Sequence, residues 1–282
     1  MTTIIPQFHL CFLLLASVVF FNGLHAQPTA DQDTSYRQVF TAPGPVRAFT
    51  TDALQQLYAI DEQQQLLKYD THFQLQFTYF NSTLGQLSSI DVANPFHLLL
   101  FFADQQTIIL LDRTLAEQGR LDLRQTPVQN ATTAALSLDN NIWVYDDYAF
   151  QLFLLNAQGK VLLASDDLRL THDITSAASQ VLRWREFVLV NFPEQGIAVF
   201  TNFGRFHHWL PLKQVLHWQA WGELVLMEKE GQHLTLNPLT GSTTPVSVPI
   251  LQTGGCFQAR QDHWYWLSPA GQLTVWHWSD SP

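Results

Sequence analysis

Carboxylates recur along this chain in short polar turns, each of which joins two apolar segments. Carboxylates that meet on one surface can bind a cation or attract a basic partner. Acidic turns can also serve only to keep a sparsely charged protein soluble. Both interpretations remain open at the level of sequence. We call the following residues the acidic rim: Asp61, Asp104, Asp146, Asp147, Glu194 and Glu230.

Motifs for nucleophilic, phosphate or zinc chemistry are not found in the sequence. It has no Gly-x-Ser-x-Gly elbow, no glycine-rich phosphate loop and no His-Glu-x-x-His pair. Adjacent histidines on a strand point to opposite faces, so His207 and His208 do not predict a chelate. Cys256 is expected to be a small buried apolar residue rather than a nucleophile. We therefore assign no catalytic residue, no metal ligand and no cofactor.

Tryptophan is concentrated in the C-terminal part of the chain, which contains seven of the nine. Exposed tryptophan stacks on sugar rings or anchors a protein interface, whereas buried tryptophan packs between sheets. We expect most of them in the core. Trp184 and Trp221 stand next to turns, which makes them the better candidates for an exposed aromatic surface.

The N-terminal segment has the features of an export signal. Leu10–Phe21 is apolar, but it is too short to span a membrane, which takes ~20 residues. We predict a signal peptide over residues 1–26, a flexible leader over 27–35 and no membrane span after cleavage. No Lys or Arg precedes the apolar run, so a membrane anchor or a misassigned start remains an alternative.

The charge balance limits the classes of partner. The formal net charge is -10, and 14 Lys and Arg stand against 24 Asp and Glu. No basic cluster is present, which argues against nucleic-acid binding. The export signal, and not the charge, predicts a location in the periplasm or at the cell surface.

A unit of short apolar strands and polar turns returns about every 40 residues, the size of a propeller blade. Its third strand ends in Asp or Asn, which can cap the following turn. Six units predict an all-β, six-bladed β-propeller over residues 36–282. The last unit lacks a fourth strand, so we expect Tyr36–Thr41 to complete it and close the ring. The predicted caps are Asp70, Asp112, Asn156, Asn202 and Asn237.

This rhythm, as in LLNAQGKVLL (Leu154–Leu163) and FTNFGRF (Phe200–Phe206), resembles six-bladed propellers of the NHL and YncE-like kind. Leu84–Leu115 is also similar to functionally uncharacterised exported propellers of Bacteroidota-type bacteria. The resemblance implies the fold and an envelope location, and the matching residues are structural ones. It implies no catalytic residues, because propellers serve as binding modules and as enzymes alike.

These observations favour an exported, non-catalytic binding or scaffold module whose partner is another protein of the bacterial envelope. The alternative is a carbohydrate-active lyase or hydrolase that uses paired carboxylates and an exposed aromatic platform. The sequence does not indicate an oligomeric state.

Overall fold

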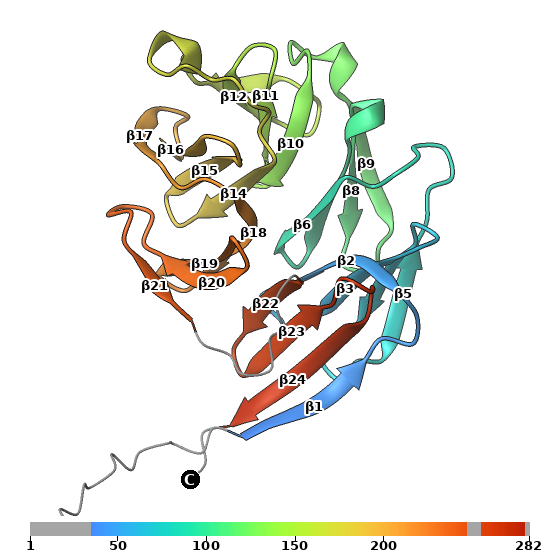
Figure 1. Cartoon of the computed structure of the whole chain (residues 1–282). Coiled ribbons are helices and arrows are strands. Elements are labelled where there is room, and N and C mark those ends of the chain that lie inside the picture. The colour runs from blue at the N-terminus through green and yellow to red at the C-terminus, as the bar shows by residue number, and fades with distance from the viewer. Residues whose placement is uncertain (1–34, 247–254, 280–282) are drawn as a thin grey trace, which may run out of the picture.

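The computed structural model describes residues 35–246 and 255–279. They form six antiparallel four-stranded sheets set side by side around a central axis (Figure 1). The predicted six-bladed propeller is therefore confirmed. No helix in the described ranges has the length and apolar character needed to cross a membrane. The predicted signal peptide and leader lie outside these ranges, except for Ser35.

The first three blades follow one another along the chain, and each begins at the central axis. Blade one contains β2 (Val46–Thr51), β3 (Leu57–Asp61), β4 (Leu66–Tyr69) and β5 (Leu75–Tyr79). Blade two contains β6 (Ser89–Asn94), β7 (His97–Phe102), β8 (Thr107–Asp112) and β9 (Glu117–Asp122). Blade three contains β10 (Ala131–Leu136), β11 (Ile142–Asp146), β12 (Gln151–Leu155) and β13 (Val161–Ala164).

The other three blades repeat this order. Blade four contains β14 (Gln180–Trp184), β15 (Phe187–Phe192), β16 (Gly196–Thr201) and β17 (Phe206–Leu210). Blade five contains β18 (Val215–Trp221), β19 (Leu224–Lys229), β20 (Gln232–Leu236) and β21 (Thr243–Pro245). Blade six contains β22 (Cys256–Arg260), β23 (His263–Leu267), β24 (Leu273–Ser279) and, from the start of the chain, β1 (Ser35–Thr41). Three short 3-10 helices are η1 (Ala103–Gln105), η2 (Leu123–Gln125) and η3 (Leu168–Leu170).

The N-terminal strand closes the ring, as the sequence predicts. β1 pairs antiparallel with β24, and the register joins Tyr36 to Trp278 and Thr41 to Thr274. This pairing covers the free edge of β24. The strand begins at Ser35, one residue before the boundary expected from the sequence.

Short polar side chains close the turns between the third and fourth strands. The Oδ1 atom of Asp112 accepts hydrogen bonds from the backbone N–H groups of Thr114 (2.7 Å) and Ala116 (3.0 Å). In blade four the cap is the Oγ1 atom of Thr201, so the predicted cap Asn202 is wrong by one position. The side chains that cap as expected are Asp70, Asp112, Asn156 and Asn237.

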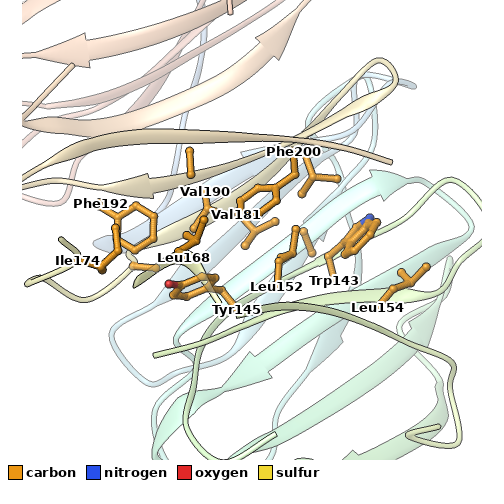
Figure 2. Packing of buried hydrophobic residues seen from close by; sticks show 14 residues of the cluster. Trp143, Tyr145, Leu152, Leu154, Leu168, Ile174, Val181, Val190, Phe192 and Phe200 are labelled. Atoms are coloured by element: carbon orange, nitrogen blue, oxygen red, sulfur yellow. The ribbon is translucent and has the colours of Figure 1, made fainter. Parts of the chain in front are cut away.

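Apolar side chains fill the spaces between neighbouring blades. Between blades three and four, Trp143 and Tyr145 from β11 pack with Val190 from β15 and Phe200 from β16 (Figure 2). Large flat side chains suit the contact between two stacked sheets, because a single blade cannot bury both of its faces. Most tryptophans, among them Trp143, Trp264 and Trp266, are buried as expected.

Hydrogen bonds between blades also fix the innermost strands. The Oδ2 atom of Asp91 in blade two accepts the N–H of Leu136 in blade three at 2.8 Å. The amide of Gln219 in blade five donates to the Ala259 carbonyl in blade six at 2.7 Å. Such bonds hold the first strands of the blades around the axis, and this arrangement positions the side chains that line the central channel.

Candidate functional site

The acidic rim lies in the loops between the second and third strands. These loops share one end of the ring with the starts of the first strands, since Val46 at the start of β2 pairs with Asp61 at the end of β3. Ala131 and Asp146 pair in the same way in blade three. The antiparallel order of each blade thus places all six of these loops at one end, which we call the rim face.

Three carboxylates of the rim face point into solvent. Glu62, Asp104 and Glu194 come from blades one, two and four and are exposed. None of the three side chains has a hydrogen-bonding or ion-pair partner within the described ranges. We call them the outward carboxylates. Glu230 is also exposed, but it pairs with Lys229 at 2.8 Å.

Three residues of the acidic rim, Asp61, Asp146 and Asp147, accept backbone N–H groups. Asp61 is half-buried and accepts the N–H of Gln65 at 2.8 Å. Asp147 is also half-buried and accepts the N–H of Ala178 at 3.1 Å. Burial, and to a smaller degree the charge of Asp146, raise the pKa of Asp147, although its hydrogen bonds act in the opposite direction.

Asp146 is the clearest departure from the expected rim. Its side chain is buried, and its two oxygens accept four backbone N–H groups at 2.7–3.2 Å. This carboxylate therefore links two segments: the connection that leads from blade two to blade three, and the loop between the second and third strands of blade three. The expectation that Asp146 is available on the surface is therefore wrong, because backbone donors surround it. The four donors belong to Gln129, Asn130, Tyr148 and Ala149.

The two tryptophans predicted to lie on the surface occupy equivalent positions in their blades, but only one of them is exposed. Each is the last residue of a first strand, at the end of the ring opposite the rim face. Trp221 is 37% exposed, as expected, whereas Trp184 is only 2% exposed. Trp184 packs against Phe187, with 6.0 Å between the ring centroids, in the core between blades four and five. Its predicted exposure is therefore wrong.

The adjacent histidines of blade four also differ from the expectation. Their Nδ1 atoms lie 2.6 Å apart, although neighbours on a regular strand point to opposite faces. A β-bulge explains the contact, because the register of β17 shifts between His208 and Phe206. Within the described ranges, no group of three His, Cys, Asp or Glu side chains is arranged to hold a metal ion.

A cavity of about 600 Å³ lies at the rim face between blades five, six and one. Glu62 and Glu228 both line it, together with His217 and Cys256. Burial raises the pKa of Glu228 and lowers that of His217, so both favour their neutral forms more than in water. Burial, and then the charge of Glu228, raise the pKa of the Cys256 thiol to about 12. That thiol is protonated at neutral pH, which agrees with its expected apolar role.

The opposite end of the channel is polar and contains arginines. A cavity of about 280 Å³, which extends toward this end, takes its lining from the first strands of all six blades. Asp91, Arg183, Arg185 and Arg260 are its charged residues, and the sequence analysis did not single out any of them. Threonine and glutamine side chains make up much of the remaining lining: Thr50, Thr51, Thr133, Gln180, Gln219 and Gln258.

No protein-family model matches the sequence, and no curated protein matches it either. The fold is similar to that of virginiamycin B lyase from Staphylococcus aureus, with a TM-score of 0.63 at 7% identity, over 87% of this chain and 99% of that one. It is also similar to a streptogramin B lyase (TM-score 0.60, 9% identity, 88% of each chain). The propeller domain of Cps50 (Swd1) from Myceliophteria thermophila has a TM-score of 0.58 at 10% identity, over 86% of this chain and 99% of that domain. These likenesses concern the fold alone.

Proposed function

We propose that this protein is an exported, non-catalytic binding propeller of the bacterial envelope, in the periplasm or at the cell surface. Its partner is a protein with a basic surface, and the rim face is the surface that meets it. The observation that carries this proposal is that the outward carboxylates extend from three different blades on one face and form no ion pair within the described ranges.

The electrostatics of the rim face support capture of a basic protein. Exposed carboxylates without an ion-pair partner steer an oppositely charged partner towards the surface that bears them. Glu230 adds little, because Lys229 neutralises it. The resemblance to exported NHL and YncE-like propellers of Bacteroidota-type bacteria agrees with an envelope location.

Reversing the outward carboxylates tests this function. We expect the triple variant Glu62→Lys, Asp104→Lys, Glu194→Lys to lose a partner that the unaltered protein enriches from native envelope, as measured by quantitative mass spectrometry after co-purification. The three side chains are exposed and make no hydrogen bond or ion pair within the described ranges, so the melting temperature should change little.

A control variant with the same change in net charge shows whether loss of the partner comes from the rim face itself or only from the altered net charge of the protein. Glu117, Asp139 and Glu186 are exposed and lie at the opposite end of the ring. Their triple replacement by Lys should leave the partner bound. Equal retention of the partner by both triple variants, or equal loss in both, contradicts the rim face as the binding surface.

A carbohydrate lyase or hydrolase is the second candidate, because Glu62 and Glu228 line the same cavity. Paired carboxylates are the usual acid and base in glycoside cleavage. No aromatic side chain of the described ranges lines that cavity beside them. The test is whether the unaltered protein cleaves a polysaccharide and whether the variant Glu228→Gln loses this activity. Both results together would favour the enzyme over the binding propeller.

A further inference from the structure

The cavity at the arginine end of the channel has features of a ligand site that the rim face does not share. It lies within the ring, and every blade contributes to its lining. The chain has only 14 Lys and Arg and a formal net charge of -10, yet three of its arginines line this single cavity. Cations gathered within a polar channel create a local field that attracts an anion, whatever the sign of the whole molecule.

Arg260 is the fixed part of this site. Its guanidinium donates to the Oγ1 atom and the carbonyl of Thr51 in blade one, both at 3.2 Å. A weaker contact at 3.4 Å reaches the Ala220 carbonyl in blade five. These bonds hold the charge between three blades, and none of the acceptors carries a negative charge. Burial lowers the pKa of Arg260, but a guanidinium stays charged at neutral pH.

Arg183 is the arginine of this site that is available to bind a ligand. Its side chain is half-buried and lines the cavity, and it has no hydrogen bond and no ion pair within the described ranges. Its Nε atom is buried without an acceptor. An arginine in this condition lacks the acceptors that a buried guanidinium normally has, so an anionic oxygen would find donors already in place.

The remaining charges of the cavity are accounted for. Arg185 forms ion pairs with Glu186 and Glu223. Asp91 accepts the N–H groups of Ala93 (2.7 Å) and Leu136 (2.8 Å), one on each oxygen. Burial raises the pKa of Asp91, while these two bonds and the charge of Arg183 act in the opposite direction. The charge of Asp52, a buried neighbour of Thr51, also acts on Arg260.

We propose that this cavity binds a small organic monocarboxylate that also carries hydroxyl groups, such as a sugar acid. Arg183 is the guanidinium of this cavity that has no partner within the described ranges, and a single such group can pair with a single carboxylate. Planar guanidinium groups fit the two oxygens of a carboxylate. The threonine and glutamine side chains of the lining offer hydrogen bonds to hydroxyl groups. This inference does not depend on the rim face, so either proposal can fail alone.

The test is calorimetric titration of the purified protein with glucuronate, with glucose and inorganic phosphate as comparison probes. We expect glucuronate to bind at millimolar or lower concentration and glucose not to bind. Arg183→Gln should weaken glucuronate binding by about tenfold or more, because a charged hydrogen bond is lost. The affinity of Arg183→Lys for glucuronate should lie between those of the unaltered protein and of Arg183→Gln. Lysine keeps the positive charge but lacks the planar, paired N–H donors of the guanidinium group.

Arg205→Gln is the matched control, because Arg205 is exposed on the same face and lies outside the cavity. It makes the same change in net charge and should bind glucuronate as the unaltered protein does. Circular dichroism and melting temperature identify any variant that has lost its fold. Absence of glucuronate binding, equal binding of glucose, equal or tighter binding of phosphate, or equal weakening by Arg205→Gln would each overturn the proposal.

Discussion

The two ends of the central channel place charge in different ways. At the rim face, Glu62, Asp104 and Glu194 stand on loops and face solvent without partners in the described ranges. At the other end, Arg183 and Arg260 stand on first strands and line a cavity inside the ring. Loop charges act over a broad surface and are screened by salt, whereas charges within the channel act at short range on a small ligand.

Charges on exposed loops and charges on strands inside the ring therefore suit partners of different size. A face of loops offers a wide area to a macromolecule. The six first strands around one axis enclose a volume of about 280 Å³, which suits a small molecule. Substitutions at the two ends should therefore have separate effects.

The largest expected effect comes from the rim residue that does not face solvent. Asp146→Ala leaves four backbone N–H groups without their acceptor, so we expect the free energy of unfolding to fall by about 3 kcal/mol or more. Glu194→Ala should change it by no more than about 0.5 kcal/mol, since Glu194 is exposed. Urea unfolding measures both. Similar losses in the two variants would contradict the division of the acidic rim into supporting and outward carboxylates.

A smaller loss of stability is expected at the arginine end. Asp91→Ala removes the acceptor of two N–H groups, one of which joins blade two to blade three, and should cost about 2 kcal/mol. It also removes a carboxyl group that interacts with Arg183, so the folded variant should bind glucuronate at least as tightly as the unaltered protein. Weaker binding by a variant that is still folded would show that Asp91 does not oppose the anion.

The smallest effect concerns pH at the same end. Burial raises the pKa of Asp262, but hydrogen bonds and the charges of His263 and His277 outweigh burial and hold it below its ordinary value. A depressed acid pKa contributes stability above the unfolded value of about 4, and this is lost as the pH falls through the folded pKa. The melting temperature of Asp262→Asn should therefore lie below that of the unaltered protein at pH 6 and approach it under strongly acidic conditions. A constant difference across this range would exclude ionised Asp262 as its source.

The sequence was sufficient for the fold because each blade repeats locally. Strand length, turn residues and the unpaired strand at the N-terminus identified the six blades and the closure by β1. It also predicted that the acidic loops share one end. Those features depend on neighbours along the chain, so a single sequence contains the information.

The sequence could not supply features that arise only when distant segments meet. Asp146 turns inward because Gln129 and Asn130 of the preceding connection offer their N–H groups to it. Trp184 is buried because blade five covers it. Arg183 and Arg260 come from blades four and six and stand at different positions in their strands. No spacing in the sequence links these two arginines, and only ring closure places both at one cavity.

The central claim is that the two ends of the ring bind independently, and one titration tests it most directly. Glucuronate is added to four proteins: the unaltered chain, the triple variant of the outward carboxylates, Arg183→Gln and Arg205→Gln. The account predicts that only Arg183→Gln weakens binding by about tenfold or more, while the other three agree closely. A triple variant that changes the affinity as much as Arg183→Gln does, or an Arg183→Gln variant that binds normally, would contradict it.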